Sequence, residues 1–526
     1  MNRTETSQGL KPSEVILTLV GLMLGVLMSA LDNTVVGTAM PKLIRDLDGL
    51  NLYSWPFTAY LLTSTLAIPV FGRLADQVGR RTVFLAGLVE FIVASVLCGL
   101  SPNMITFVIF RGLQGLGGGI LVSNAFALAG EISRPERRGA YMGMIGAMFG
   151  ISGLLGPAVG GLLADGPGWR WAFYINIPLG LAALAVLFFG LRHVKEETTR
   201  PEIDPWGLVF FVLAVSPLML ALSWGGRDWA WDHPLILGLL AASAVFLVLF
   251  LLVERNSPHA LLPAWLFRRL DFNLASLGVF LSNAVFFGAI LFLPLWIQEV
   301  LGASAASSGL ALTPLLVSYV LASVLAGQFF GKLKSLRGFA MGFGILALVG
   351  CLGLMFVDKS MGTLPLMAAM IVLGLGLGAN TPVFTVAAQN SVEPRFIGLA
   401  TATNNFFRNL GASVGSAVMG SVFLGRLDAG LAHIDWGQTP DSLKQTLQSP
   451  KVLMSPASLK AIGDQIPASF KPAFQQLIGQ IDDRLALAIG GVFVVMVVVA
   501  AVSLPVLLFL RGKRRDETVS SREEGR

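Results

Sequence analysis

The chain has 526 residues, of which 54% are hydrophobic and only 13% are charged. A soluble globular protein carries about a quarter charged residues, so this composition excludes a soluble globular protein and places much of the chain in lipid, where charge is expensive. The net charge of +6 does not indicate nucleic-acid binding, because the basic residues sit in short segments between apolar runs. The two cysteines lie inside apolar runs and predict no disulfide framework.

Fourteen apolar runs are long enough to cross a bilayer. The first follows a polar segment, 1–14, and has no small-residue cleavage site, so it is predicted to be a membrane helix rather than a signal peptide. Given that a span needs about 20 residues, the predicted spans are roughly 15–39, 52–72, 82–100, 104–128, 140–163, 174–191, 206–224, 235–253, 273–298, 305–327, 339–357, 363–387, 396–423 and 486–510.

The placement of lysine and arginine tests this number of spans, because loops that stay in the cytoplasm are enriched in these residues. With both termini in the cytoplasm, the predicted cytoplasmic segments hold 24 lysines and arginines, and the short external loops hold five. A missed or extra helix would invert half of this bias. We therefore predict a multi-pass protein of the bacterial inner membrane with both ends inside.

The spans group into two halves. We predict a cytoplasmic N-terminus at 1–14, a six-helix half at 15–191, an inserted helix pair at 206–253, a second six-helix half at 273–510 that includes an external loop at 424–485, and a cytoplasmic tail at 511–526. The stretch after the second span has an eroded copy after the tenth, at 327–337. Internal repeats with a substrate site between them are typical of secondary transporters.

The loop between the second and third spans reads Gly72-Arg73-Leu74-Ala75-Asp76-Gln77-Val78-Gly79-Arg80-Arg81. Its glycines permit a tight turn and close helix approach, and its aspartate can bond helix ends and arginines, which predicts a conformational latch. A basic loop that only sets topology would explain the arginines but not the spaced glycines and the aspartate. The latch candidates are Gly72, Arg73, Asp76, Gly79 and Arg80.

The fifth span carries a glycine-lined face with one proline. Such a face permits close packing, and the proline can kink the helix. The simpler interpretation is that these glycines only allow close helix packing, and they are expected to do so whether or not the face has a further role. The residues of this face are Gly153, Gly156, Pro157, Gly160 and Gly161.

These patterns resemble a known family. The loop at 72–81 resembles the signature loop of the major facilitator superfamily, and the glycine face resembles its antiporter motif, which is associated with exporters. With three further strings, at 31–41, 169–178 and 293–302, the fourteen-span chain is similar to the EmrB/QacA-type drug:proton antiporters. The resemblance implies an all-α major facilitator fold and proton-driven export of small lipophilic compounds such as drugs, antibiotics and dyes, without a cofactor.

Ionisable residues inside a bilayer are candidates for function. Asp32 in the first span and Arg111 in the fourth lie roughly 12 and 10 Å from the outer surface at about 1.5 Å per residue, so they can share one level. We hypothesise that Asp32 binds the proton and Arg111 tunes it; a permanent structural ion pair is the alternative. The string from Arg111 to Gly115 also resembles the family's proposed proton-transfer element in its fourth helix.

Two further charged residues have open interpretations. Glu90, near the middle of the third span, could attract a cationic substrate or carry a second proton, or it could be a neutral acid that faces another helix. Arg408 in the thirteenth span either faces the cavity or pairs with a carboxyl or carbonyl group. Some relatives carry an acidic residue late in the chain that helps with dicationic substrates; here Asn404, Asn405 and Arg408 argue against such substrates.

A midplane cavity with apolar walls and a few polar groups would recognise the substrate. Its candidate residues are polar or aromatic and lie within predicted spans or close to their ends. They are Asn33, Gln114, Asn124, Asn283, Phe286, Phe287, Trp296, Gln298, Asn380, Gln389, Asn404 and Arg408.

Other functions fit less well. A membrane-embedded enzyme would need clustered carboxylates or histidines, but the four histidines are scattered, and the sequence has no metal-ligand spacing, phosphate-binding loop or nucleophile elbow. An importer or metabolite porter of the same fold stays an alternative that the glycine face disfavours. The expected partners are a small-molecule substrate, protons and the lipid bilayer, with a periplasmic adaptor as a further candidate.

Overall fold

The fold is that of a computed structural model of the full chain. The structure describes residues 11–49, 52–192, 204–257, 259–301, 311–330, 336–357, 363–434, 441–447 and 471–510, together with Trp436, Ile462 and Ile466. The predicted segment 1–14 therefore lies mostly outside the described residues, and so does the central part of the predicted external loop 424–485. The tail 511–526 lies outside them entirely.

The first half and the inserted pair are helical throughout. The helices of the first half are α1 (Pro12–Leu47), α2 (Trp55–Val78), α3 (Arg80–Gly99), α4 (Met104–Ile132), α5 (Pro135–Asp165), α6 (Trp171–Tyr174) and α7 (Asn176–Gly190). A hairpin of α8 (Pro205–Trp224) and α9 (Pro234–Asn256) follows, and a short helix, α10 (Ala264–Phe267), leads into the second half.

The second half repeats this helical build. Its helices are α11 (Leu270–Leu301), α13 (Thr313–Phe330), α14 (Leu336–Phe356), α15 (Thr363–Asn390), α16 (Ile397–Leu431), α17 (Asp441–Leu447) and α20 (Lys471–Phe509), with a 3-10 turn at Pro394–Phe396. Across the described ranges no strand occurs, and Gly225 and Trp229 form an isolated bridge. The predicted all-α membrane fold is confirmed.

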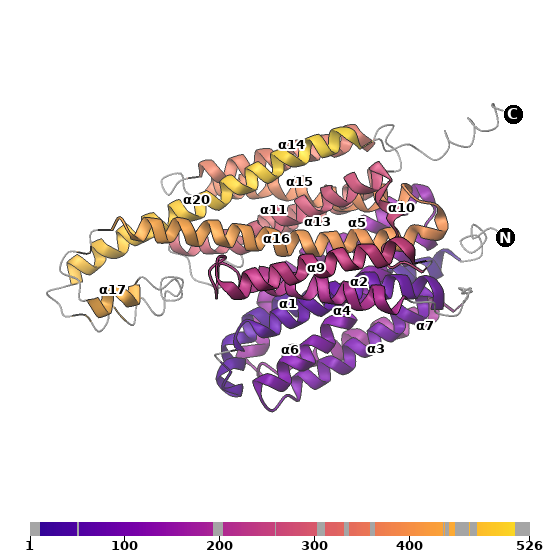
Figure 1. Ribbon diagram of the computed structural model, residues 1–526, viewed down its shortest axis with the longest axis horizontal. Helices are drawn as coiled ribbons and strands as arrows, with labels where there is room; N and C mark the ends of the chain where they lie inside the picture. Colours follow the sequence, from indigo (N-terminus) through magenta and orange to yellow (C-terminus); the bar gives the residue numbers. More distant parts are fainter. Residues whose placement is uncertain are drawn as a thin grey trace.

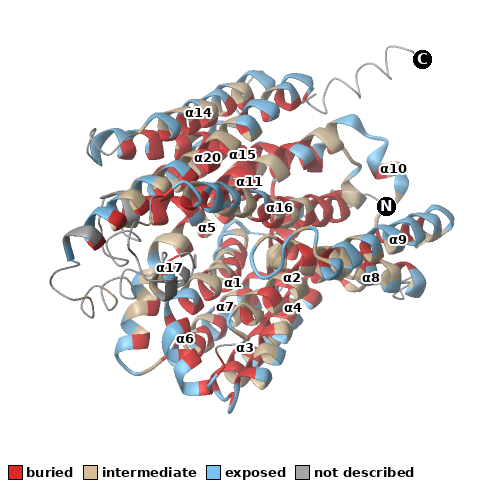
Figure 2. Ribbon diagram, turned by 60° about the vertical axis from the view of Figure 1, so that its left-hand side comes forward, coloured by how far each residue is buried: buried red, intermediate tan, exposed pale blue. Residues whose placement is uncertain are grey.

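Thirteen helices of the described part are long and apolar enough to cross a membrane, and α13 is a shorter apolar helix at the tenth predicted span. Side chains on the outer faces, such as Val245, Val248 and Leu252 of α9, are more than half exposed. Figure 2 shows α9 at the edge of the bundle with many exposed residues, whereas α11 and α16 lie further inside and are largely buried where they meet other helices. Lipid is the solvent that such an apolar exterior fits.

Several helix ends follow from local sequence signals. The side chain of Asn103 caps α4 by accepting a hydrogen bond of 2.9 Å from the backbone N–H of Thr106. Proline occupies the first turn of α1, α2, α5, α8 and α9, where its missing N–H costs nothing. Gly79 separates α2 from α3 with a φ of 105°, which a side chain would disfavour.

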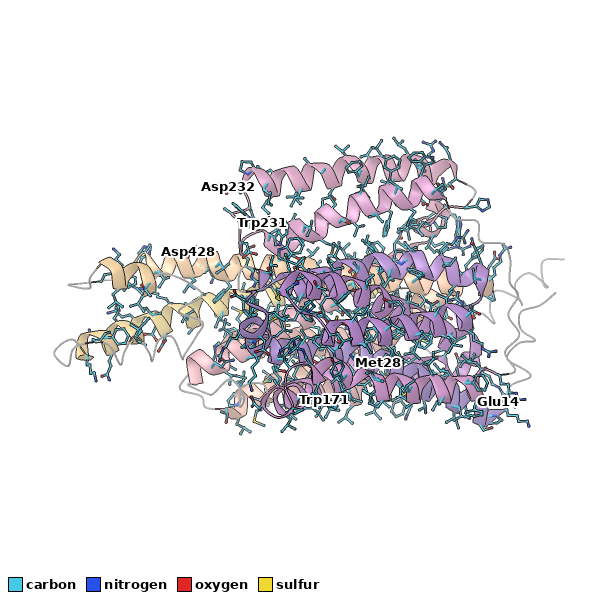
Figure 3. All side chains as sticks on the ribbon, turned by 90° about the horizontal axis from the view of Figure 1, so that it is seen from below. Glu14, Met28, Trp171, Trp231, Asp232 and Asp428 are labelled. Carbon is cyan, nitrogen blue, oxygen red and sulfur yellow. The ribbon has the colours of Figure 1, made fainter. Side chains whose placement is uncertain are left out.

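The observed helices depart from the predicted spans at several ends. In the first half, α1 continues to Leu47 and α2 continues to Val78. The sixth predicted span, 174–191, corresponds to α7, and the short helix α6 precedes it, separated from it at Ile175. On the side away from the termini, α16 continues to Leu431 and α20 begins at Lys471, so both ends of the predicted loop 424–485 are helical. Apolar contacts sustain these extensions, because Leu431 and Phe474 belong to one buried cluster. Figure 3 shows Asp428 on the part of α16 that, beside the start of α20, reaches out beyond the rest of the bundle.

The two halves lie side by side, and the α8–α9 hairpin packs against both (Figure 1). Between the halves, α5 packs on α13 and α15, while α16 packs on α2 and α4. The hairpin contacts α2 and α16 through α8, where Phe211 tilts against Phe406 at 5.7 Å. At the hairpin turn (Figure 3), Trp231 donates a hydrogen bond of 2.5 Å to Ser421 of α16.

The halves meet closely at one end of the bundle. We call this end the terminal side, because it holds the start of α1 at Pro12 and the end of α20 at Phe509. Here α5 and α13 approach with backbone against backbone, since a Cβ at Gly327 would overlap the carbonyl of Gly139. Nearby, Arg138 donates a hydrogen bond of 3.3 Å to Asn390 of the other half. The two halves are therefore closed against each other at the terminal side.

Candidate functional site

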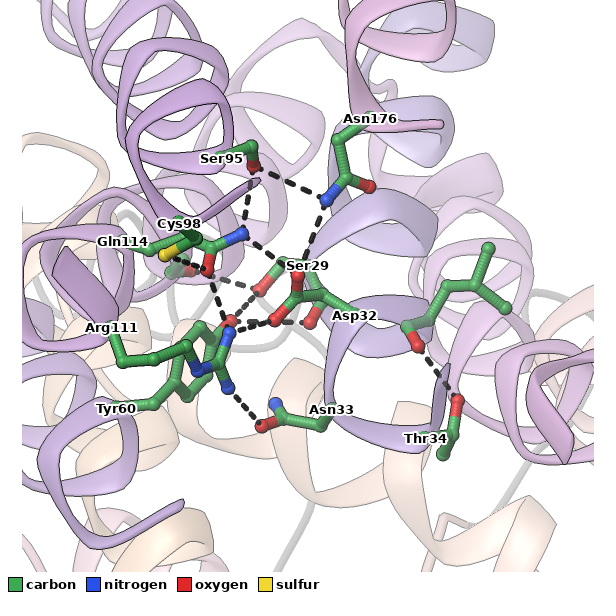
Figure 4. Close-up of polar contacts among 12 residues, drawn as sticks. Ser29, Asp32, Asn33, Thr34, Tyr60, Ser95, Cys98, Arg111, Gln114 and Asn176 are labelled. Atoms are coloured by element: carbon green, nitrogen blue, oxygen red, sulfur yellow. Dashed lines mark hydrogen bonds and ion pairs between the residues drawn. The ribbon is translucent and has the colours of Figure 1, made fainter. Parts of the chain in front are cut away.

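A buried ion pair lies inside the first half. The Arg111 guanidinium on α4 pairs with the Asp32 carboxylate on α1, and the two side chains are completely enclosed (Figure 4). The same Arg111 nitrogen, Nη1, donates a hydrogen bond of 2.7 Å to Gln114 Oε1. Arg111 and Gln114 reach one partner because residues three apart lie on one face of a helix.

The Asp32 carboxylate accepts two further hydrogen bonds. Gln114 Nε2 donates to Asp32 Oδ1 over 2.8 Å, and Asn176 Nδ2 of α7 donates to the same oxygen over 3.2 Å. Both amides also donate to Ser95 Oγ of α3, over 2.8 and 3.2 Å. These donors satisfy the carboxylate oxygens, so the charged group can be buried.

Tyr60 of α2 completes the network around the ion pair. The Arg111 guanidinium lies 4.4 Å from the centre of the Tyr60 ring, a cation–π arrangement. The Tyr60 hydroxyl lies 2.9 Å from Ser29 Oγ, one turn before Asp32 on α1. We call the residues Ser29, Asp32, Tyr60, Ser95, Arg111, Gln114 and Asn176 the Asp32 network.

Glycines of α4 make this network possible. A Cβ at Gly118 would overlap the Tyr60 hydroxyl, and a Cβ at Gly115 would overlap the backbone of α2. Small residues of this kind let helix backbones approach closely in a bilayer. The glycine-rich stretch of α4 therefore places Arg111 beside α1 and α2.

The sequence predicted that Asp32 and Arg111 share one level of the membrane, and the structure places them in contact. Reasoning from the sequence did not single out Ser29, Tyr60 or Ser95, which are ordinary residues within apolar runs. Asn176 lies in the 169–178 string. A polar amide inside a predicted membrane span is the sequence signal that could have identified it.

Glu90 lies outside the Asp32 network. It lines a hollow of about 580 Å³ between α3 and α4, whose other walls are apolar side chains such as Val93 and Leu97 of α3 and Leu113 of α4. Gly117 of α4 gives the Glu90 carboxyl room, and the Oε2 atom has no hydrogen-bond partner among the described residues. The Glu90 carboxyl therefore faces another helix and lies outside the hydrogen-bonded network around the Asp32–Arg111 pair.

The predicted latch residues lie at the terminal side. Arg80 pairs with Asp76 and donates a hydrogen bond of 2.6 Å from Nε to Glu131 of α4. The second half covers this cluster, because a Cβ at Gly398 of α16 would overlap the Arg80 guanidinium. Likewise, a Cβ at Gly72 would overlap Ala402. The predicted loop 72–81 is helical except at Gly79, and it is the end of α2 and the start of α3 that contact the start of α16.

The glycine face of α5 packs mainly against α1. A Cβ at Gly156 would overlap Thr34 and a Cβ at Gly160 would overlap Thr38, whereas Gly153 faces Leu316 of α13 and Gly161 faces open space. Pro157 lies within α5, which continues through it. Thr34 also donates a hydrogen bond of 3.2 Å to the Ser152 carbonyl. Since Thr34 lies two residues after Asp32, this contact ties the Asp32 network to α5.

The predicted substrate residues fall into three groups. Asn124 of α4, Asn380 and Gln389 of α15, and Asn404 and Arg408 of α16 are buried on helices that meet between the halves. Gln389 donates a hydrogen bond of 3.4 Å to the Phe126 carbonyl across this interface. Gln114 belongs to the Asp32 network instead, and Asn33 lies at its edge, 3.5 Å from Arg111.

The remaining candidates lie on α11. Phe286 stacks on Tyr319 of α13 with ring centres 4.6 Å apart, and Phe287 is 39% exposed. Trp296 is buried in the hydrophobic core of the second half, and Gln298 is half-buried near the end of the helix. Asn283 donates a hydrogen bond of 3.0 Å to the Val279 carbonyl of its own helix.

Comparison with known proteins places the chain in a family. The family model for the Major Facilitator Superfamily matches residues 22–416. The chain is 38% identical over 416 residues to the multidrug transporter protein MdtP of Bacillus subtilis, covering 79% of this chain and 76% of that protein. It is 33% identical over 506 residues to multidrug resistance protein 3 of Bacillus subtilis, covering 95% and 96% of the two chains.

A fungal relative and a solved structure extend this comparison. The chain is 32% identical over 438 residues to the rubrofusarin-specific efflux pump aurT of Gibberella zeae, covering 81% of this chain and 79% of that protein. Its fold matches the human organic anion transporter MFSD10 with a TM-score of 0.59 at 18% identity, over 79% of this chain and 94% of that one. The chain therefore belongs to the major facilitator superfamily, and it is a membrane transporter rather than an enzyme.

Proposed function

We propose that this transporter exports small lipophilic or amphipathic compounds in exchange for protons. The observation that carries the proposal is the Asp32–Arg111 pair, a carboxylate and a guanidinium buried in the interior of a membrane protein. An ionisable group at such a depth is costly and marks a proton or ion pathway. The bacterial and fungal relatives named as multidrug transporters and efflux pumps support export of such compounds.

Protonation of Asp32 would change how α1 is held. The charged carboxylate binds Arg111 of α4, Gln114 of α4 and Asn176 of α7, whereas the neutral acid loses the ionic attraction to Arg111. Two residues further along α1, Thr34 packs on the glycine face of α5. A proton at Asp32 would therefore loosen α1 from α4 and let it shift against α5.

The helix α5 would carry this shift to the second half. It packs on α13 at the terminal side, where the backbones of Gly143 and Ser323 meet, and Ser323 donates a hydrogen bond of 2.9 Å to the Gly143 carbonyl. We propose that the terminal side faces the cytoplasm, in keeping with the lysine and arginine bias of the sequence. The described state is then closed to the cytoplasm, and rocking of the halves opens the α5–α13 contact and the latch around Arg80.

Transport in vesicles tests the proposal. A susceptibility panel of dyes, disinfectants and antibiotics in a pump-deleted host identifies a transported compound, and its movement is then followed in proteoliposomes under an imposed pH gradient. We expect the wild type to move the compound in the direction opposite to the proton flow. We expect the same of Asp228→Asn, a substitution in the exposed hairpin turn. We expect Asp32→Asn to lose gradient-driven movement. Movement that ignores the imposed gradient in the wild type would refute proton antiport.

A further inference from the structure

Three arginines are buried in the described part of the chain, and one of them has no carboxylate partner. Arg80 pairs with Asp76 and Glu131, and Arg111 pairs with Asp32. Arg408 of α16 is 6% exposed and forms no ion pair with a described residue. Its Nη2 donates a hydrogen bond of 3.2 Å to Thr385, while Nε and Nη1 have no partner among those residues.

A lone guanidinium in this position needs a physical reason. Burying a cation without a counterion is unfavourable, and unpaired charges inside membrane proteins mark ligand sites. The Arg408 guanidinium lies 4.8 Å from the centre of the Phe126 ring and 5.8 Å from that of Phe149. These contacts offset part of the cost, but they leave the positive charge uncompensated.

The location of Arg408 suits a bound molecule. Phe126 and Phe149 belong to the first half, whereas Arg408 belongs to the second, so the guanidinium lies where the two halves meet. Repeat-built transporters hold their substrates at this boundary. One turn before Arg408, the side chains of Asn404 and Asn405 are completely buried, and none of their amide atoms has a partner among the described residues.

Aromatic side chains add an apolar part to this site. Tyr319 of α13 lies within electrostatic reach of Arg408, its hydroxyl is 2.9 Å from Thr381, and its ring stacks on Phe286. Aromatic rings from both halves therefore surround a cation with free hydrogen-bond donors. A flat apolar body with one negatively charged group complements this arrangement.

We propose that Arg408 binds the anionic group of the substrate, and that the transporter therefore selects lipophilic aromatic anions such as aryl carboxylates, sulfonates or phenolates. This inference rests on the proposed export function and names the substrate class for it. Asn404 and Asn405 supply further hydrogen bonds, and Phe126, Phe149 and Tyr319 contact the rings of the substrate.

Three probes with one ring system test the charge preference. Binding of 9-anthracenecarboxylate, neutral 9-anthracenemethanol and cationic 9-anthracenylmethylammonium is measured by fluorescence on the full-length protein in lipid nanodiscs. We expect the wild type to bind the carboxylate most tightly. In Arg408→Gln the affinity for the carboxylate falls by about tenfold or more, the loss expected for a hydrogen bond to a charged group, and the affinity for the alcohol stays within about twofold.

Two controls separate charge recognition from misfolding. Arg408→Lys keeps the cation and retains carboxylate binding between that of the wild type and Arg408→Gln, while Arg137→Gln removes an exposed arginine and changes nothing. Retained alcohol binding shows that the glutamine variant is folded. The proposal is wrong if the wild type binds the carboxylate no more tightly than the ammonium probe, or if Arg408→Gln weakens carboxylate and alcohol equally.

The proposed export function has a separate readout. Proton-driven movement of the neutral alcohol in proteoliposomes reports export without involving the anionic group. If this movement occurs while the carboxylate preference is absent, the anion inference fails and export stands. If the carboxylate preference is present and no probe responds to a pH gradient, proton antiport fails and the anion site stands.

Discussion

Removing one partner of the buried Asp32–Arg111 pair is expected to lower the free energy of unfolding of the protein. Asp32→Asn leaves the completely buried Arg111 guanidinium without its counterion. Breaking a buried ion pair in this way costs about 3–5 kcal/mol, mostly because an uncompensated charge stays buried. Arg111→Gln leaves the Asp32 carboxylate with two amide donors, from Gln114 and Asn176, and we expect a loss of similar size.

The double variant Asp32→Asn/Arg111→Gln carries neither charge. We expect its loss of stability to be smaller than that of either single variant, because no isolated charge remains in the interior. The resulting coupling energy between the two sites is expected to be at least about 3 kcal/mol, the lower end of the range for a broken buried pair.

Two buried cysteines provide the assay. Cys98 lies 3.5 Å from Gln114 in the first half, and Cys351 lies in the core of the second half. A thiol-reactive fluorophore reports their exposure as the detergent-solubilised protein unfolds on heating, and Cys351→Ala isolates the signal of the first half. If the losses of the two single variants simply add in the double variant, the two side chains are not coupled and the reasoning from the pair is refuted.

Three further predictions address the helix contacts and one helix cap. Gly156→Ala should lower transport by pushing a threonine of α1 away from α5, whereas Gly161→Ala, which faces open space, should leave efflux from whole cells unchanged; equal loss in both would contradict the packing argument. Gly398→Ala should displace the Arg80 guanidinium and loosen the terminal side, seen as faster labelling of single cysteines placed at that interface, and unchanged labelling would count against the latch. Hydrogen bonds from backbone N–H groups at the start of α8 hold the pKa of Asp204 below its usual range. Asp204→Ala should therefore destabilise the hairpin by about 0.5–2 kcal/mol at neutral pH, and thermal unfolding should show this difference vanish as the pH falls through the pKa of the carboxyl; a difference that persists in acid would exclude the cap.

Much of the fold could be predicted because lipid imposes simple rules. A run of apolar residues must form a helix of a fixed minimum length, and this rule located the observed helices well. It did not predict how far α16 and α20 continue beyond the membrane-length runs, to Leu431 and from Lys471, because these extensions depend on contacts between segments distant in sequence. The break at Ile175 between α6 and α7 does have a local signal, because Pro178 has no backbone N–H to donate to the Tyr174 carbonyl at the end of α6.

The candidate site was predictable only in part, for a physical reason. Charges within apolar runs are conspicuous, so Asp32 and Arg111 could be paired by their depth alone. Depth does not tell which face of a helix a side chain occupies, and only the structure shows that the Glu90 carboxyl lies beside Gly117 of α4, outside the network around the pair. Tyr60 and Ser95 are common residues in membrane helices, and only the packing of α2 and α3 against α4 shows that they complete the network.

Proton release on substrate binding tests the central claim most directly. A transported compound is added to purified protein in a weakly buffered solution, and the pH is followed with a soluble indicator. If Asp32 exchanges its proton for the substrate, the wild type releases protons in proportion to the bound compound, and Asp32→Asn binds the compound without releasing any. Equal proton release by the wild type and Asp32→Asn would contradict the account.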